Sequence, residues 1–328
     1  MTHRFGRLAL GATLALALFV SPSAVGGDGG YGAERQAEAQ EAAPDWNSVN
    51  DFLYQLQNVN LAAVGRTKFD LVIMDYSRDG SDEEKFTAQE ISALKNSPGG
   101  PKLVLSYMSI GEAEDYRWYW QSDWDANHDG RPDAGAPAWL GPSNPDWEGN
   151  YKVRYWDPAW QQIVYAYVDK VLAAGYDGVY LDIVDAYEYW EPGGPDSPDR
   201  ATAEDEMVAF VKEIAAHART QDSDFGVFVQ NAEDLSSHPD YVAAVSGIGK
   251  EDLFYNGNRR QPASETAYSI SRLDKFKAAG KPVLVTDYVT KARQVNNFYT
   301  RAGAKGYVPY ASRRDLDLLK INRGHEPD

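Results

Sequence analysis

Carboxylate residues recur along this chain where short apolar segments end. Asp182 lies within GVYLDIV (178–184), and Glu233 follows FGVFVQ (225–230). Burying a carboxylate in an apolar strand costs several kcal/mol unless it has partners or a task. Further carboxylates follow other apolar segments: Asp75, Glu112, Asp185, Glu251 and Asp287. Such acids either cap the next helix or divide acid–base and nucleophilic work between two carboxylates, which is the chemistry of a glycosidase.

Other catalytic chemistries lack their residues. The chain has no Cys, which excludes a thiolate nucleophile, a disulfide and a cysteine-based zinc site. None of the five His stands where the base of a catalytic triad would. Neither the HExxH motif nor the G-x-S-x-G motif occurs. Paired carboxylates remain, and they need no cofactor for catalysis.

Aromatic residues with a polar end accompany the acids. The chain has 21 Tyr and 9 Trp. Any one ring can belong to the core, but rings in loops beside carboxylates also suit stacking on sugar rings and attract the cation of an amino sugar. We assign four of these rings to substrate binding: Tyr54, Tyr76, Tyr107 and Tyr288.

One polar segment resembles a calcium-binding loop. In SDWDANHDGRPDAGAP (122–137), oxygen-bearing side chains and a turn glycine stand at positions 1, 3, 5, 6 and 9 of an EF-hand-type loop: Asp125, Asn127, Asp129, Gly130 and Asp133. Position 12 is Ala136, where a bidentate Glu belongs. The segment is therefore either a solvated turn or a site for a structural Ca²⁺.

The charge balance limits the partners. The 328 residues carry 32 basic and 49 acidic side chains, a formal net charge of -17. This charge repels nucleic acid and anionic membrane surfaces, and it attracts a cationic substrate. The hydrophobic share of 43% and the charged share of 25% are typical of a folded globular protein, which we expect to be a monomer.

The N-terminus has the pattern of a secretory signal. Residues 1–24 combine basic residues, an apolar run from Leu8 to Val20, and small residues at the end. The run is shorter than the roughly 20 residues that span a bilayer, although it could also stay as an uncleaved anchor. Residues 25–44 predict a flexible linker, and residues 45–328 the folded domain. We therefore expect a secreted protein that leaves the membrane once the signal is cleaved.

Strands and helices alternate through the folded domain. The helix signals include a capping box at Ser81 and Glu84, a start at Asp157-Pro158, and Ala-Gly pairs that end helices at Gly175, Gly280 and Gly303. The predicted strands cover residues 51–57, 69–76, 102–110, 178–184, 225–230, 245–250, 281–288 and 306–310.

Eight strands in alternation with helices predict a single (β/α)₈ TIM barrel of the α/β class, with an insertion between strands 3 and 4. A doubly wound open sheet is the alternative, but no strand is followed by a glycine-rich phosphate loop. In a barrel, the loops at the carboxyl ends of the strands carry the chemistry. The acids named above all lie at or after those ends.

Several segments together resemble glycoside hydrolase family 114, the endo-α-1,4-polygalactosaminidase-like proteins. The likeness spans about residues 45–315. It is carried by LSYMSIGEAEDYRWYW (105–120), NPDWEGNYKVRYWDPAWQ (144–161), YDGVYLDIVDAYEYW (176–190), VQNAEDL (229–235), GIGKEDLFY (247–255) and VLVTDYV (283–289). The resemblance implies a (β/α)₈ barrel that cleaves α-1,4-linked, galactosamine-rich polysaccharide.

The resemblance also implies site residues. The Asp of YLDxVD falls on Asp182 and the Glu of QNxE on Glu233, which would form the catalytic pair. Other motif positions would line the sugar cleft: Asp75, Tyr107, Glu112, Asn231, Glu251 and Asp287. In a retaining mechanism Asp182 would attack the anomeric carbon and Glu233 would protonate the leaving oxygen, with carboxyl groups about 5–5.5 Å apart.

Two other functions remain open on the sequence. A carbohydrate-binding barrel without activity and an α-glycosidase of another linkage would share the fold. A cationic, partly deacetylated polymer suits the acidic charge best, so we expect it to be preferred over a fully acetylated one.

Overall fold

The computed structural model describes residues 43–194 and 199–328. The predicted signal segment and nearly all of the predicted linker lie outside these residues. Residues Ala43–Asp328 form one compact unit.

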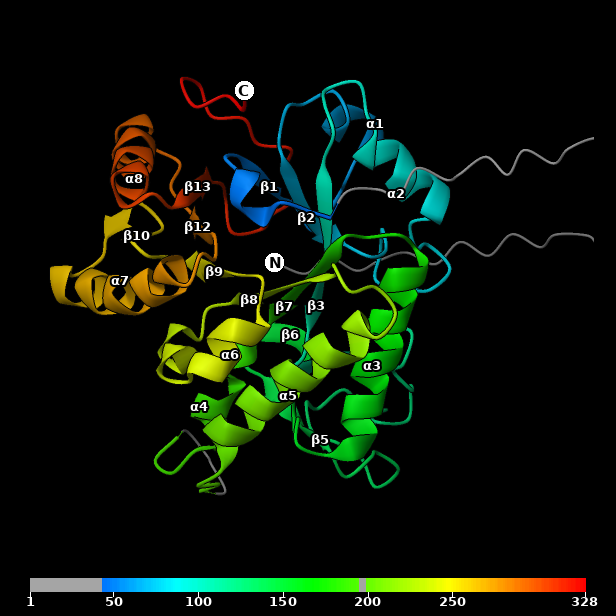
Figure 1. Cartoon of the computed structure of the whole chain (residues 1–328). Helices are drawn as coiled ribbons and strands as arrows, with labels where there is room; N and C mark the ends of the chain where they lie inside the picture. The colour runs from blue at the N-terminus through cyan, green and yellow to red at the C-terminus, as the bar shows by residue number, and fades with distance from the viewer. Residues whose placement is uncertain (1–42, 195–198) are drawn as a thin grey trace, which may run out of the picture. The chain divides into compact units, whose positions relative to one another are not determined.

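Within the described residues, eight parallel strands form one sheet (Figure 1). Their order follows the chain: β1 (Phe52–Tyr54), β2 (Leu71–Asp75), β3 (Leu103–Ser109), β7 (Gly178–Asp182), β8 (Gly226–Gln230), β9 (Gly247–Glu251), β12 (Val283–Asp287) and β13 (Val308–Ala311). The last strand lies next to the first, so the sheet is a nearly closed barrel. The predicted barrel is confirmed. All residues of β2, β8 and β12 are buried, because the barrel interior covers one face and helices cover the other.

Helices connect the strands. Those of the described chain are α1 (Leu61–Val64), α2 (Ala88–Lys95), α3 (Pro158–Ala173), α4 (Tyr187–Trp190), α5 (Ala203–Arg219), α6 (Pro239–Ala244), α7 (Ala263–Ala278) and α8 (Ala292–Lys305). Short 3₁₀ turns are η1 (Trp46–Ser48), η2 (Val184–Ala186) and η3 (Glu233–Ser237). As predicted, α3 starts at Pro158. Asp157 is its N-cap, since the Asp157 carboxylate accepts the Ala159 N–H at 2.8 Å.

Two helix boundaries differ from the prediction. The capping box at Ser81 is wrong, since α2 starts six residues later, where Thr87 and Glu90 form the reciprocal box. Gly175 and Gly280 follow helix ends in the left-handed region, with φ of 79° and 74°. Gly303 does not, because α8 continues past it to the left-handed Gly306.

The insertion between the third and fourth barrel strands contains a small antiparallel sheet that the sequence analysis missed. Its order is β4 (Glu112–Glu114), β6 (Trp147–Val153) and β5 (Leu140–Asn144). A second two-stranded ribbon, β10 (Tyr255–Asn256) with β11 (Arg259–Arg260), follows β9. The insertion starts three residues after β3, so its sheet arises at the end of the barrel where the strands finish.

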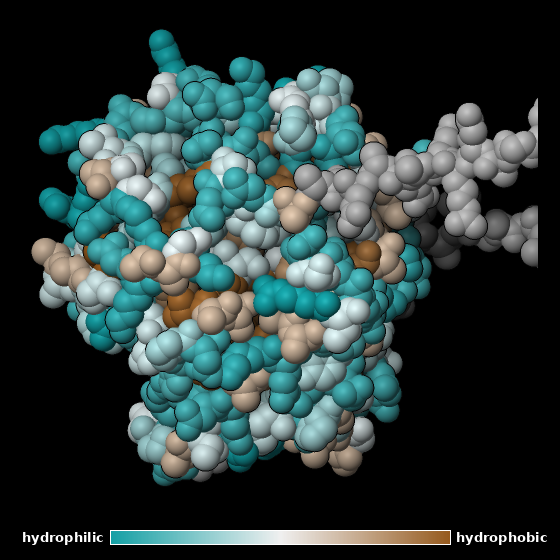
Figure 2. Space-filling model, in the orientation of Figure 1, coloured by the Kyte–Doolittle hydropathy of each residue, from teal (hydrophilic) through white to brown (hydrophobic). Residues whose placement is uncertain are grey.

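The visible face of the molecule is mostly hydrophilic, with smaller apolar patches between the polar residues (Figure 2). No helix in the described ranges combines the length and apolar character that crossing a membrane requires.

Candidate active site

Three neighbouring barrel strands each end on a polar residue of the site. β7 ends at Asp182, β8 at Gln230 and β9 at Glu251. The Gln230 amide nitrogen Nε2 lies 2.9 Å from Asp182 Oδ1 and 2.9 Å from Glu251 Oε2. This nitrogen therefore bridges the two carboxylates. Asp182 Oδ1 and Glu251 Oε2 can be no farther apart than twice 2.9 Å.

The Asp182 carboxylate is held by three donors. Tyr107 Oη donates to Oδ2 at 2.6 Å, and the Ile183 N–H and the Gln230 amide both donate to Oδ1. The side chain remains partly exposed to solvent. Asp182 is thus held in a fixed orientation while part of its side chain stays in contact with solvent.

The Glu251 carboxylate also has side-chain donors. Tyr288 Oη donates to Oε1, while the Gln230 and Asn231 amides donate to Oε2, at 2.9 and 3.3 Å. The Asn231 side-chain oxygen in turn accepts the Glu251 N–H at 3.1 Å. Glu251 is partly exposed as well.

The two carboxylates influence each other's protonation. Burial, followed by the negative charge of Glu251, raises the pKa of Asp182 to about 8. Burial also raises the pKa of Glu251, against the hydrogen bonds of Tyr288 and Asn231, which lower it. Because two like charges this close oppose each other, the pair retains a proton near neutral pH.

The backbone turns sharply after each of these strands. Ile183, Asn231, Ala232 and Asp252 all have φ between 51° and 56°, in the left-handed region that residues with a Cβ rarely adopt. Gly111 makes room for the first turn, since a Cβ at this position would lie 2.1 Å from the Ile183 carbonyl oxygen. Non-glycine residues in such conformations cluster at functional sites.

Glu233 occupies a different environment from Glu251. It opens η3 three residues after β8, and it is 7% exposed. Its Oε1 lies 3.0 Å from Lys250 Nζ and accepts the Ser269 hydroxyl at 2.5 Å. The structure thus pairs Glu233 with a cation, and it joins Asp182 to Glu251 through Gln230. The catalytic role of Glu233 stays a prediction.

A polar cavity of about 420 Å³ opens beside Glu251. Asp185, on η2, lines it, and the Asp185 carboxylate has no side-chain hydrogen bond or ion pair within the described residues. Burial raises the pKa of Asp185 to about 6, although the positive charge of Lys250 lowers it. The cavity is lined by Asp185, Asn231, Lys250, Glu251, Asp252, Leu253, Gln261, Glu265 and Ser269.

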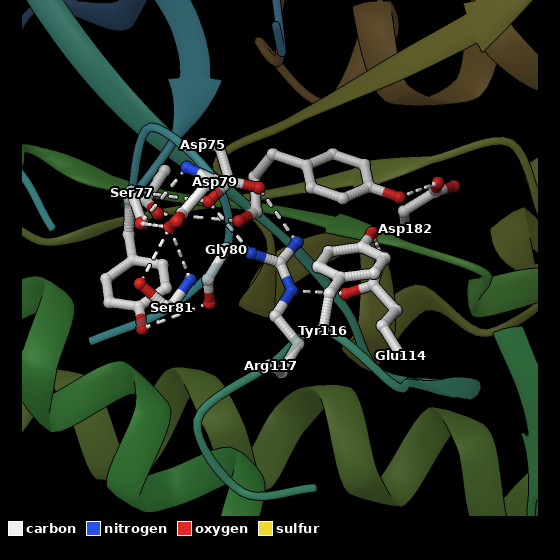
Figure 3. A network of polar contacts seen from close by, with 12 residues as sticks. Asp75, Ser77, Asp79, Gly80, Ser81, Glu114, Tyr116, Arg117 and Asp182 are labelled. Atoms are coloured by element: carbon white, nitrogen blue, oxygen red, sulfur yellow. Dashed lines mark hydrogen bonds and ion pairs between the residues drawn. The ribbon is translucent and has the colours of Figure 1, made fainter. Parts of the chain in front are cut away.

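Asp75 belongs to a buried ion-pair network. Arg117, whose side chain is 0% exposed, places Nη1 and Nη2 each 2.8 Å from the two Asp75 oxygens. Its Nε donates to Glu114 at 2.6 Å, and Tyr116 donates to the same carboxylate. Figure 3 shows the guanidinium between Asp75 and the Glu114–Tyr116 pair, with Asp182 nearby. Asp75 therefore anchors the segment after β3.

Two predicted substrate contacts are fully buried. Glu112 is 0% exposed and binds Lys152 Nζ at 2.6 Å, together with the Asn144 and Asn150 amides. Asp287 is 0% exposed and accepts the backbone N–H groups of residues 253–255 at 2.8 to 3.1 Å. Neither carboxylate faces solvent. Glu112 fixes the inserted sheet, and Asp287 fixes the loop after Glu251.

The four tyrosines do not share one environment. Tyr107 and Tyr288 donate to the two carboxylates, and Tyr54 donates to Gln230 Oε1 at 2.9 Å. The Tyr76 hydroxyl lies instead 3.4 Å from the Gly80 carbonyl oxygen and from Asp82. The structure brings the first three together around the pair and leaves Tyr76 outside it.

The calcium-like loop is closed by hydrogen bonds of its own. Asp125 accepts the N–H groups of Asp129 and Gly130 at 3.1 and 3.0 Å, and the Tyr151 hydroxyl at 2.6 Å. Asp133 accepts the Ala126 N–H at 2.8 Å. Among the residues described, no cluster of three or more His, Cys, Asp or Glu is arranged to hold a metal. Calcium binding stays a prediction.

Sequence analysis missed Gln230, Arg117 and Lys250. Gln230 ends a buried strand as Asp182 does, and a polar residue at that position is the signal that could have found it. Arg117 is the cation within an aromatic, acidic segment, which is a recognisable signal for a buried ion pair. Nothing in the sequence shows that Lys250 pairs with Glu233.

Comparisons with known proteins bear on the family and the fold of the chain. The family model for glycoside-hydrolase family GH114 matches residues 34–325. An uncharacterized protein of Methanocaldococcus jannaschii is 40% identical over 280 residues, which is 82% of this chain and 77% of the relative. One from Thermotoga maritima is 35% identical over 282 residues, or 83% of each chain.

Two solved structures share the fold. The glycoside hydrolase domain of PelA from Pseudomonas aeruginosa has a TM-score of 0.59 at 18% identity, over 84% of this chain and 98% of that domain. Aspergillus fumigatus Ega3, solved in complex with galactosamine, has a TM-score of 0.61 at 17% identity, over 84% of this chain and 96% of the other. At these identities the likeness is one of fold alone.

Proposed function

This protein belongs to glycoside-hydrolase family GH114 and is a glycoside hydrolase. We propose that it cleaves α-1,4-linked, galactosamine-rich polysaccharide at internal bonds of the polymer. The proposal depends chiefly on one observation, the two carboxylates that Gln230 joins at the ends of β7 and β9. Both carboxylates are partly exposed, and Glu251 lines the polar cavity, so a sugar bound there could reach the pair.

We assign the chemistry to Asp182 and Glu251. Three donors orient the Asp182 carboxylate, which suits attack on the anomeric carbon. The pair retains one proton near neutral pH, and with that proton on Glu251 this group can protonate the leaving oxygen and then activate water, while ionised Asp182 attacks. Bridged oxygens within twice 2.9 Å favour the retaining mechanism, in which the carboxyl groups are about 5–5.5 Å apart, over inversion at roughly 6.5–9.5 Å.

The charge of the chain supports an amino-sugar substrate. A polymer with free amines is cationic near neutral pH, and a net charge of -17 would concentrate it. At the site, the unpaired Asp185 carboxylate can receive an ammonium group. The complex of Ega3 with galactosamine supports the same class of sugar. We expect partly deacetylated polymer to be preferred.

Three isosteric variants test the assignment. Asp182→Asn and Glu251→Gln should each reduce cleavage of partly deacetylated polygalactosamine by at least about 100-fold, since each removes a reacting carboxyl group. Glu233→Gln should retain most activity, because Glu233 is paired with Lys250. Mass spectrometry of the products measures both the rate and internal cleavage.

The opposite pattern, with Glu233→Gln inactive and Glu251→Gln active, would reinstate the pair expected from the sequence. Wild-type protein that binds the polymer without shortening it would show that the barrel only binds carbohydrate. Cleavage of other α-linked polymers at a higher rate would contradict the proposed specificity.

We also propose that the protein is secreted, on the pattern of residues 1–24. N-terminal sequencing of exported protein tests this, and a mature chain that still begins at Met1 would contradict it.

A further inference from the structure

We propose that Gln230 is a positioning residue that keeps Asp182 and Glu251 apart as a matched pair, and that Tyr54 fixes the orientation of its amide. This inference rests on the proposed function of the pair, and nothing in the family match assigns either residue this role. Both side chains are buried, Gln230 at 3% exposure and Tyr54 at 1%.

Every polar atom of the Gln230 amide has a defined partner. Nε2 has two N–H groups, and these meet the two carboxylates at 2.9 Å each. Oε1 accepts the Tyr54 hydroxyl at 2.9 Å. An amide turned by 180° would point its oxygen at both carboxylates and its nitrogen at the hydroxyl, so only the observed orientation satisfies the whole network.

Tyr54 is itself held in place. Its ring lies 5.4 Å from that of Tyr180, centre to centre. Tyr180 occupies space that only glycine leaves free on β9, because a Cβ at position 249 would lie 1.7 Å from the Tyr180 hydroxyl. A series of packing contacts and hydrogen bonds thus connects the barrel interior to the two carboxylates. It runs through Gly249, Tyr180, Tyr54 and Gln230.

A neutral amide differs in effect from a cation at this position. A lysine would neutralise one carboxylate, whereas the amide donates a hydrogen bond to each and leaves the negative charge unchanged. With Gln230 between them, the carboxylates are also kept from sharing a single proton in a direct hydrogen bond.

Other titratable and charged groups surround the pair from the neighbouring elements, and none of them is replaced in the Gln230, Tyr54 and Tyr155 variants. These are Tyr107 on β3, Tyr180 on β7, Asp185 on η2, Lys250 on β9, and Asp252, Tyr288 and Arg314 in the loops after β9, β12 and β13.

Carboxyl ¹³C NMR titration tests the proposal without any substrate. Signals of Asp182 and Glu251 are assigned by comparison with Asp182→Asn and Glu251→Gln. Gln230→Met removes both donors at similar side-chain length, so the apparent pKa values of the pair should rise by about one unit. Tyr54→Phe releases the amide and should raise them less.

The double variant Tyr54→Phe/Gln230→Met separates positioning from general packing. In the Gln230→Met background, Tyr54→Phe should cause no further shift, because its effect passes through the amide. Tyr155→Phe is the matched control, since Tyr155 is buried and donates one hydrogen bond, to the Ala203 carbonyl, away from the pair. It should leave both titrations unchanged.

Activity gives a second readout. The pH optimum should move upward in Gln230→Met together with the titrations, and kcat should fall about tenfold with little change in KM. Unchanged titrations in Gln230→Met, or equal shifts from Tyr54→Phe in both backgrounds, would overturn the proposal. Shifted titrations in an enzyme inactive on every galactosamine polymer would overturn only the proposed substrate.

Discussion

At the scale of single residues, two carboxylates of the site are held by several donors, whereas a third has no side-chain partner among the described residues. Asp182 and Glu251 each have three hydrogen-bond donors, so binding need not orient them. Asp185 differs, because its carboxylate faces the cavity without a side-chain partner. An unpaired carboxylate beside the reacting groups is suited to recognising the amine of an incoming sugar.

Replacing Asp185 therefore tests substrate recognition. Asp185→Asn should lower kcat/KM on deacetylated polymer about 10- to 100-fold, mainly through KM, since a charge-assisted hydrogen bond is lost. The effect should shrink at high salt and on fully acetylated polymer. Asp224→Asn removes an equal charge at the opposite ends of the strands and should change little. An equal loss on both polymers would contradict recognition of the amine.

At the scale of elements, one buried arginine links the second strand to the insertion. Arg117 contacts Asp75 at the end of β2 and Glu114 on β4. Its side chain is fully buried, and the two carboxyl side chains are 11% and 2% exposed. A cation shared by two buried carboxylates holds the insertion against the barrel, close to Asp182 (Figure 3).

Removing this cation should destabilise the fold. Arg117→Met should lower the free energy of unfolding by about 3–5 kcal/mol, because it leaves two buried carboxylates without a partner. Urea denaturation measures this. Arg78→Met, which breaks the more exposed Arg78–Glu90 pair, should cost no more than about 1 kcal/mol. The combination Arg117→Met/Asp75→Asn/Glu114→Gln should recover part of the lost stability, because the two carboxylates become neutral. Equal losses in Arg117→Met and Arg78→Met would contradict the anchoring role of Arg117.

At the scale of the whole molecule, the carboxylates of the site make stability depend on pH. Burial raises the pKa of Asp185 to about 6, of Asp287 to about 7 and of Asp182 to about 8. The folded state thus holds protons that the unfolded state releases near pH 4. Stability from these groups is fully present below that pH and is lost as pH rises toward 8.

Thermal unfolding at several pH values checks whether stability falls as the pH rises. The Tm should fall between pH 5 and pH 8, and the fall should be smaller in Asp185→Asn, which cannot ionise and loses no side-chain partner. At pH 8 this variant should unfold at a higher temperature than the wild type, and Asp224→Asn should behave like the wild type. A Tm that rises between pH 5 and pH 8 in the wild type would contradict the assignment.

Much of this architecture could be predicted from the sequence. Parallel strands buried on both faces read as continuous apolar runs, which is why the eight strands and the acids at their ends were identified. The sequence could not show which carboxylate is joined to Asp182, because Glu233 and Glu251 both stand at or after strand ends. Only the three-dimensional structure shows that Gln230 connects Asp182 to Glu251. The inserted sheet was missed because β5 and β6 are polar and partly exposed, with no clear alternation.

The left-handed residues after β7 and β8 have a consequence for laboratory evolution. Ile183 and Ala232 each hold a conformation that costs about 1–2 kcal/mol for a residue with a side chain. A library screened for heat tolerance alone would therefore tend to collect glycine or asparagine at these two positions. Such winners would loosen the turns beside the carboxylates, so the gain in heat tolerance would come with slower turnover.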